Sequence, residues 1–157
     1  MISSIIKSFI PLYGDGYRFR LMLRFREFSR KNNIIWLSIC IKNYLLHKFS
    51  CELSINAKIS PKVLFMHTTG VVIGEGVIIE DGVKIYSGVV LGRKDIMNES
   101  DYPIIRKDAV LGAGAKILGK VEIGERVIIG ANSLVLTNIN SGTWAGIPAR
   151  QVKGDAQ

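Results

Sequence analysis

Hydrophobic positions in the C-terminal two thirds of the chain recur every six residues. An aliphatic side chain marks the first position of each unit, and a second small or branched residue follows four positions later. The first positions are Ile73, Ile79, Ile85, Leu91, Ile105, Leu111, Ile117, Ile123, Ile129 and Val135. A period of six fits neither the 3.6-residue turn of a helix nor the two-residue alternation of a strand, so it indicates an internal structural repeat.

The repeat predicts a mainly β solenoid. Six residues suit one short strand plus one turn, and three units close a triangular coil whose first positions stack inward on the next coil. Extended backward, the same phase places Ile55, Pro61 and His67 at first positions. Glycines that follow first positions are expected to relieve backbone strain at the corners. They are Gly74, Gly92, Gly112, Gly124 and Gly130.

The phase breaks between Leu91 and Ile105, which are 14 residues apart instead of 12 or 18. The interval 93–104 is polar and charged, and a solenoid accommodates such an insertion as a loop that leaves the coil. The loop is either a plain surface excursion or a segment that closes an active site. Its position halfway along the solenoid favours the second reading.

The N-terminal third has a helical pattern instead. Residues 19–31 and 34–49 predict two helices separated at Asn32 and Asn33. We therefore expect a helical extension at 1–50, a solenoid at 51–140 with an insertion at 93–104, and a C-terminal tail at 141–157. The helices are predicted to form a cap on the first coil. A compatible hypothesis is that they present a basic, aromatic surface to anionic lipid through Phe19, Phe25, Phe28 and Trp36.

Charge is concentrated in this extension. Residues 1–50 hold nine Lys/Arg and two Asp/Glu, whereas the remainder holds twelve and eleven. A nearly neutral solenoid argues against nucleic acid binding and for one positive face. The apolar stretches are too short to span a bilayer, and two cysteines are too few for a disulfide framework. We expect a cytoplasmic protein, with peripheral contact to the inner face of the membrane as the further hypothesis.

His67 is the candidate catalytic base. It occupies a slot that aliphatic residues fill in the other units, and its imidazole suits proton abstraction near pH 7. The alternative is a buried structural histidine with a polar partner. The repeat contains no other histidine, so a metal site with three histidine ligands is not expected. Neither Cys40 nor Cys51 has a visible base partner, which disfavours an acyl-cysteine intermediate.

Several segments, in order and in register, resemble serine acetyltransferases of the hexapeptide-repeat acyltransferase superfamily. Residues 67–75, His-Thr-Thr-Gly-Val-Val-Ile-Gly-Glu, are similar to that family's His-Ala-Thr-Gly-Ile-Val-Ile-Gly-Glu segment. The likeness continues through 85–92, 111–119 and 129–133, and it ends with Ala-Gly-Ile-Pro-Ala-Arg at 145–150. It covers roughly residues 52–154 and is more specific for the superfamily than for the substrate.

The resemblance implies a left-handed parallel β-helix with a short N-terminal α-helical cap, assembled as a homotrimer. It further implies direct acetyl transfer from acetyl-CoA, without a metal, with His67 as base. An acidic residue from the preceding coil holds the imidazole in that family, and this position falls on Glu52. An exposed charge at the junction of helix and solenoid is the alternative reading of Glu52.

The same resemblance places acetyl-CoA in a groove toward the C-terminal coils. Small residues at Ala113, Gly114, Ala131 and Gly146 would keep the groove wall low, and Arg150 and Lys153 would face the phosphates. The alternative for these two cations is a solvated tail. Backbone N–H near Gly92 is the candidate for stabilising the thioester oxyanion.

Two departures bear on the acceptor. The family has Asp directly before the histidine, where this chain has Met66, and its loop has Arg-His-Pro, where this chain has Asp101-Tyr102-Pro103. Met66 and Tyr102 are poor partners for a zwitterionic amino acid, and Tyr102 suits stacking on a sugar. We therefore expect O-acetylation of a bacterial surface polysaccharide or its precursor. The alternatives are serine O-acetylation in cysteine biosynthesis and a non-enzymatic scaffold.

Overall fold

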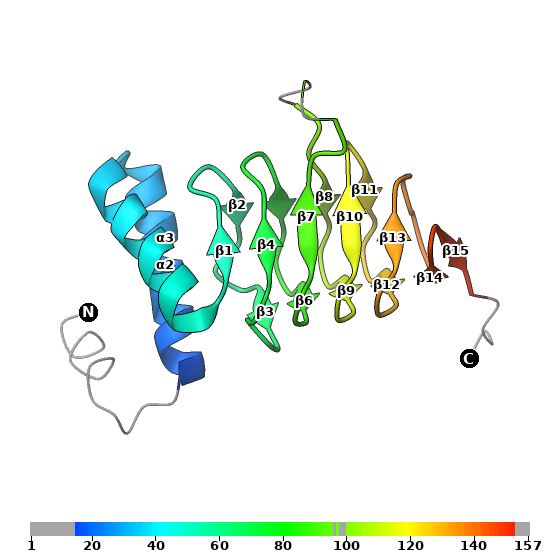
Figure 1. The fold of residues 1–157 in the computed structure, drawn as a ribbon, viewed down its shortest axis with the longest axis horizontal. Coiled ribbons are helices and arrows are strands. Elements are labelled where there is room, and N and C mark those ends of the chain that lie inside the picture. The colour runs from blue at the N-terminus through cyan, green and yellow to red at the C-terminus, as the bar shows by residue number, and fades with distance from the viewer. Residues whose placement is uncertain (1–14, 96, 98–99, 153–157) are drawn as a thin grey trace.

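Short strands from successive coils pair in parallel and build the three walls of a solenoid (Figure 1). The computed structural model describes residues 15–95, 97 and 100–152. The first wall comprises β1 (Glu52–Leu53), β4 (Val72–Ile73), β7 (Val90–Gly92), β10 (Lys116–Leu118) and β13 (Leu134–Val135). The second comprises β2 (Lys58–Ile59), β5 (Ile78–Ile79), β8 (Ile104–Ile105) and β11 (Glu122–Ile123). The third comprises β3 (Leu64–Phe65), β6 (Lys84–Ile85), β9 (Val110–Leu111), β12 (Ile128–Ile129), β14 (Thr143–Gly146) and β15 (Ala149–Gln151).

Both apolar positions of each predicted unit face the interior from Ile73 onward. In the unit that begins at Ile73, the side chains of Ile73 and Val77 are fully buried. The same holds at the far end of the repeat, where Ser133 takes the second position and is also buried. Strand β14 extends the third wall, and β15 pairs with it antiparallel. The predicted β solenoid is thus confirmed from Ile73 to the C-terminal coils.

The backward extension of the phase is wrong by two residues. Leu53 pairs with Ile73, 20 residues later, whereas Ile73 pairs with Leu91, 18 residues later. The first coil therefore carries two extra residues, which lie at the corner between Phe65 and Val71. Parallel pairing forces the inward positions of coil one onto those of coil two, so an excess can be absorbed only at a corner. The inward residues are Leu53, Ile59 and Phe65 in place of Ile55, Pro61 and His67.

The role predicted for the glycines also needs correction. Those that follow first positions do not have a positive φ. They are required because the next coil approaches closely: a Cβ on Gly112 would lie 2.7 Å from the backbone nitrogen of Ala131. Left-handed backbone occurs instead at the corner between the third and first walls, in a column made of Gly70, Gly88 and Gly114. Their φ angles are 71°, 67° and 71°.

The insertion predicted at 93–104 leaves the solenoid at the corner between β7 and β8, as the upper part of Figure 1 shows. Asp101 holds the base of this loop together, because its carboxylate accepts hydrogen bonds from the backbone N–H groups of Lys94, Asp95 and Lys120. These bonds favour the ionised carboxylate and hold the pKa of Asp101 below its ordinary value.

Two helices close the N-terminal end of the solenoid (Figure 1). They are α2 (Asp15–Lys31) and α3 (Ile35–Phe49), so the predicted helix pair and the break between them are confirmed. Phe19 is 3% exposed, and its ring makes edge contacts with Phe49 and Phe65 at 5.1 and 4.9 Å between ring centroids. The helices and the first coil share one apolar core. Among the described residues, no helix is both long and apolar enough to cross a bilayer.

A buried arginine joins the cap to the first coil. The guanidinium of Arg26 donates hydrogen bonds to the carbonyl oxygens of Ser54 and Ala57, which lie in the turn after β1. It also forms an ion pair of 2.9 Å with Glu27, which pairs in turn with Arg30. Burial lowers the pKa of Arg26, and the carboxylate of Glu27 opposes this shift. The carbonyls of the open end thereby gain a donor that the next coil supplies elsewhere.

Replacing Arg26 with Met should therefore destabilise the protein strongly. The turn carbonyls would lose their donor inside a buried site, and breaking a buried charged interaction typically costs about 3–5 kcal/mol. Arg24→Met is the matched control, because Arg24 lies on the same helix and is exposed. Urea unfolding measures both free energies, and equal stability of the two variants would show that Arg26 is not an anchor.

Candidate active site around His67

The two extra residues of the first coil displace His67 from the core. They widen the corner between β3 and β4, so His67 is exposed where a strict repeat would point it inward. Its ring lies 6.1 Å from that of Tyr86 in the next coil. A histidine that is neither packed in the core nor hydrogen bonded by a buried partner is available to a ligand. This geometry favours the catalytic reading over the structural one.

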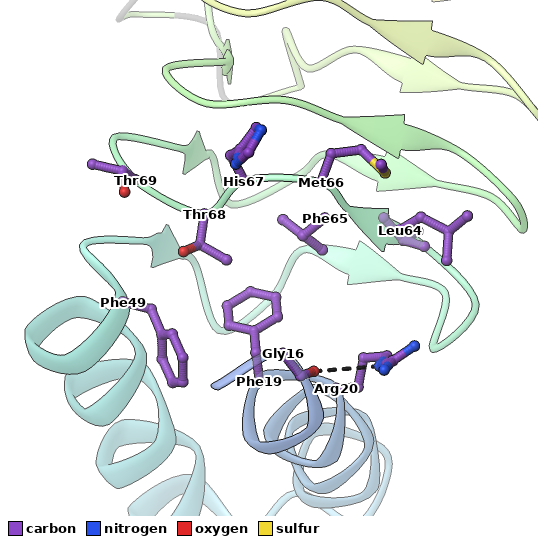
Figure 2. A pocket seen from close by; sticks show the side chains of 11 residues that line it. Gly16, Phe19, Arg20, Phe49, Leu64, Phe65, Met66, His67, Thr68 and Thr69 are labelled. Atoms are coloured by element: carbon purple, nitrogen blue, oxygen red, sulfur yellow. Dashed lines mark hydrogen bonds between the residues drawn. The ribbon is translucent and has the colours of Figure 1, made fainter. Parts of the chain in front are cut away.

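A cavity of about 470 Å³ adjoins this corner, between the first coil and the cap (Figure 2). Such a volume is in the usual range for small-molecule sites. The solenoid contributes Val63, Leu64, Phe65, Met66, His67, Thr68 and Thr69 to its lining, and the helices contribute Gly16, Phe19, Arg20 and Phe49. The lining is thus largely apolar, with His67 and Arg20 as its titratable side chains.

The structure does not join Glu52 to His67. Glu52 lies at the start of β1, near the same corner, and its carboxylate is 3.6 Å from the Lys42 ammonium of α3. Among the described residues, no hydrogen bond connects this carboxylate to the imidazole. The dyad that the resemblance implies therefore stays a prediction, and it would require Glu52 to exchange partners.

Four of the residues predicted for cofactor binding lie along one edge of the solenoid. The corner column that begins beside His67 continues through Ala113, Gly114 and Ala131, because each corner N–H donates to a carbonyl of the preceding coil. Gly146 continues the edge, and its N–H donates to the Ser133 hydroxyl at 3.2 Å. Small side chains along this edge leave room for an extended ligand to approach the backbone.

The remaining cofactor candidates lie elsewhere. Arg150 is exposed on the terminal hairpin, where it pairs with Ala145. Lys153 falls outside the described residues. Gly92 ends β7 at the opposite edge of the first wall, next to the loop, so within one chain its N–H is remote from His67.

The two residues predicted to contact the acceptor are separated in the same way. Met66 lines the cavity beside His67, whereas Tyr102 lines a second cavity near Gly76 and Arg93. The Tyr102 ring packs so closely on the coil that a Cβ on Gly76 would lie 2.2 Å from it. The guanidinium carbon of Arg93 lies 5.6 Å from the ring centroid. Tyr102 therefore cannot act beside His67 in the same chain.

Sequence reasoning missed the contribution of the cap to the cavity. Arg20, Phe19 and Phe49 come from helices whose docking on the first coil no periodicity specifies. The signal for Thr68 and Thr69 was present, since the 20-residue spacing of the first coil localises the excess to their corner.

Neither cysteine is arranged as a nucleophile. Cys51 is buried, and burial raises the pKa of its thiol to about 12, which keeps it protonated. Cys40 is exposed on the outer face of α3. Within the part of the chain that the structure describes, no three His, Cys, Asp or Glu residues gather as metal ligands.

Comparison with known proteins identifies the repeat. Residues 102–137 match the family described as bacterial transferase hexapeptide (six repeats). The chain is 37% identical over 145 residues to the serine acetyltransferase of Haemophilus influenzae, covering 92% of this chain and 54% of that protein. It is 43% identical over 134 residues to the serine acetyltransferase of Buchnera aphidicola, covering 80% of this chain and 49% of that protein.

Solved structures agree with this result. A truncated serine acetyltransferase apoenzyme superposes with a TM-score of 0.82 at 37% identity, covering 90% of this chain and 59% of that one. A soybean serine acetyltransferase complexed with serine gives 0.76 at 33% identity, covering 81% and 53%. These likenesses confirm the predicted left-handed β-helix. The chain spans about half the length of the curated relatives it matches.

The relatives contradict the predicted saccharide acceptor, because they are named serine acetyltransferases. The prediction combined Met66 and Tyr102 into one pocket. The structure places them at different edges of the solenoid, so they do not jointly argue against a small amino-acid acceptor.

Proposed function

Because this chain is a hexapeptide-repeat protein whose solenoid matches those of serine acetyltransferases, we propose that it transfers an acetyl group from acetyl-CoA to the hydroxyl of serine. The observation that carries the proposal is the position of His67, displaced from the hexapeptide register to the wall of an open cavity. One relative of known structure is described as a complex with CoA, and another as a complex with serine.

His67 acts as the general base in this proposal. An imidazole nitrogen takes the proton of the acceptor hydroxyl while the oxygen attacks the thioester carbonyl carbon. The tetrahedral intermediate then collapses, the carbon–sulfur bond breaks, and the departing thiolate takes the proton from the imidazolium. Glu52 would stabilise the imidazolium after leaving Lys42, and its exposed ion pair makes that exchange inexpensive.

Acetyl-CoA would lie along the edge formed by Ala113, Gly114, Ala131 and Gly146, with its acetyl end toward His67. This edge suits an extended ligand because its side chains are small and the column of corner glycines is continuous. Arg150 would meet the phosphates as an exposed cation, and Lys153 is proposed for the same task.

A homotrimer would complete the site. His67 and the small-residue edge lie on one side of the first wall, whereas Gly92 and Tyr102 lie on the other. A cyclic assembly joins unlike edges of neighbouring copies, so the loop edge of one chain can face the His67 edge of the next. The backbone N–H of Gly92 would then reach the thioester oxygen from the neighbouring chain.

The cap is further proposed to contact anionic membranes. The lipid-facing residues differ from the expected set, since Phe19 is buried whereas Phe28 and Trp36 are 57% and 69% exposed. Both lie near the turn between α2 and α3, close to the exposed Lys31. The first 50 residues contain two acids, Asp15 and Glu27, and Glu27 is buried. Exposed aromatic rings beside unopposed basic side chains suit a lipid interface.

His67→Ala should lower the turnover number by roughly a hundred- to ten-thousand-fold, which is the usual contribution of a general base. The affinity for CoA, measured by calorimetry, should stay within about twofold because the imidazole contacts the reacting atoms only. Glu52→Gln should weaken the same step less, and the double variant should be far from additive. Near-normal turnover of His67→Ala would remove His67 from the mechanism.

The trimer can be tested by mass and by complementation. Sedimentation should give three times the chain mass of 17.4 kDa. His67→Ala and Tyr102→Ala chains should each be poorly active alone. Randomly mixed trimers should recover roughly a quarter of the wild-type activity, because one in four interfaces pairs the two intact edges. An active monomer, or a fully active Tyr102→Ala variant, would contradict the shared site.

Membrane contact predicts flotation of the full-length protein with anionic vesicles at low salt, decreasing as salt rises. Replacing Phe28 and Trp36 together with Ser should reduce flotation, whereas the same change at Tyr44, outside the turn, should not. Absence of binding to anionic vesicles at low salt would leave the helices as a cap alone.

A further inference from the structure

Arg20 is a cation without a charged partner at the wall of the cavity that contains His67. Its side chain lies on the cap side of the cavity, opposite the solenoid corner (Figure 2). Its Nε donates to the carbonyl oxygen of Gly16 at 3.3 Å, one turn earlier in α2. Among the described residues, no carboxylate forms an ion pair with it, and none lines the cavity. The terminal N–H groups of Arg20 are therefore available to a ligand.

The position of Arg20 is set by its neighbour in the chain. Phe19 is buried between Phe49 and Phe65, and this packing attaches the first turns of α2 to the coil that carries His67. Arg26, two turns later, secures the same helix to the turn after β1. An arginine on a helix held at two points presents its guanidinium from a defined side, although the side chain itself is exposed.

We propose that Arg20 binds the carboxylate of the acceptor, so that the helical cap forms part of the acceptor site. This inference rests on the proposed transfer to a hydroxyl. A planar guanidinium binds a carboxylate through two parallel hydrogen bonds, and a partly apolar cavity strengthens them. The acceptor would lie across Phe65 and Met66, with its hydroxyl toward His67 and its carboxylate toward Arg20.

The same cavity offers no anionic partner for an ammonium group. Met66, the residue next to the base, is apolar, and the polar groups that line the cavity beside His67 are the hydroxyls of Thr68 and Thr69. Acceptors should therefore be selected by their carboxylate more than by their amine. The expected substrate class is small hydroxy acids, with serine as a member whose ammonium group contributes little.

Three acceptors separate these contributions when each is supplied with acetyl-CoA to the full-length protein. L-serine has both charged groups, 3-hydroxypropionate has the carboxylate alone, and ethanolamine has the ammonium alone. The first two should differ in kcat/KM by less than about tenfold. Ethanolamine should be roughly ten- to a hundredfold poorer, as expected for a lost charge-assisted hydrogen bond.

Arg20→Gln should raise KM for serine and 3-hydroxypropionate by roughly ten- to a hundredfold and leave ethanolamine unchanged. Arg20→Lys should recover part of the loss because the charge remains. Arg24→Gln is the matched control, since Arg24 is exposed one turn later on the same helix and does not line the cavity.

The outcomes distinguish this inference from the function on which it rests. Serine acetylation that is equal in wild type and Arg20→Gln would overturn the role of Arg20 and leave the proposed transfer intact. An equal loss for all three acceptors in Arg20→Gln would also overturn it, because the effect would not concern the carboxylate. If the wild-type protein acetylates none of the three, the proposed function itself fails.

Discussion

Parallel pairing between coils is the constraint on which the rest of this structure depends. Each coil must place its inward residues on those of the coil before it, because its backbone N–H groups donate to carbonyls of the neighbouring coil and its aliphatic side chains fill a shared column. A coil can therefore differ in length from the others only at a corner. This chain departs from the 18-residue coil at two corners: the one that carries His67 and the one that carries the loop before Pro103.

This constraint explains which structural features could be predicted. The inward columns from Ile73 onward follow from the period alone, and a helical pattern before Cys51 was enough to predict the cap. The first coil was misplaced because a strict period was extended across a corner where the chain contains two more residues. The misfit was visible in the sequence, since Pro61 and His67 are poor inward residues and Leu53, Ile59 and Phe65 lie two positions earlier.

The candidate site was less accessible to sequence reasoning, because a repeat specifies which corner a residue occupies but not what lies opposite. His67 and the edge formed by Ala113, Gly114 and Ala131 could be identified from motifs. The distance between Met66 and Tyr102 could not, and treating them as neighbours led to the wrong acceptor. Arg20 has no sequence signature at all, since nothing in α2 distinguishes it from Arg24 until the helix is docked on the first coil.

Helix α2 shows how one residue type serves two purposes, according to what surrounds it. Arg26 is buried, and its charge is tolerated because carbonyl oxygens and Glu27 surround it. Arg20 is exposed and lacks such partners among the described residues, so it remains able to bind an anion. The open end of a solenoid has to be covered in any case, because its last coil has unpaired carbonyls and an uncovered core. Once Arg26 and Phe19 fasten the cap for that reason, a neighbouring residue on the same helix is positioned over the His67 cavity without further structural cost. Stability of the cap and recognition of the acceptor are thus coupled through a single helix.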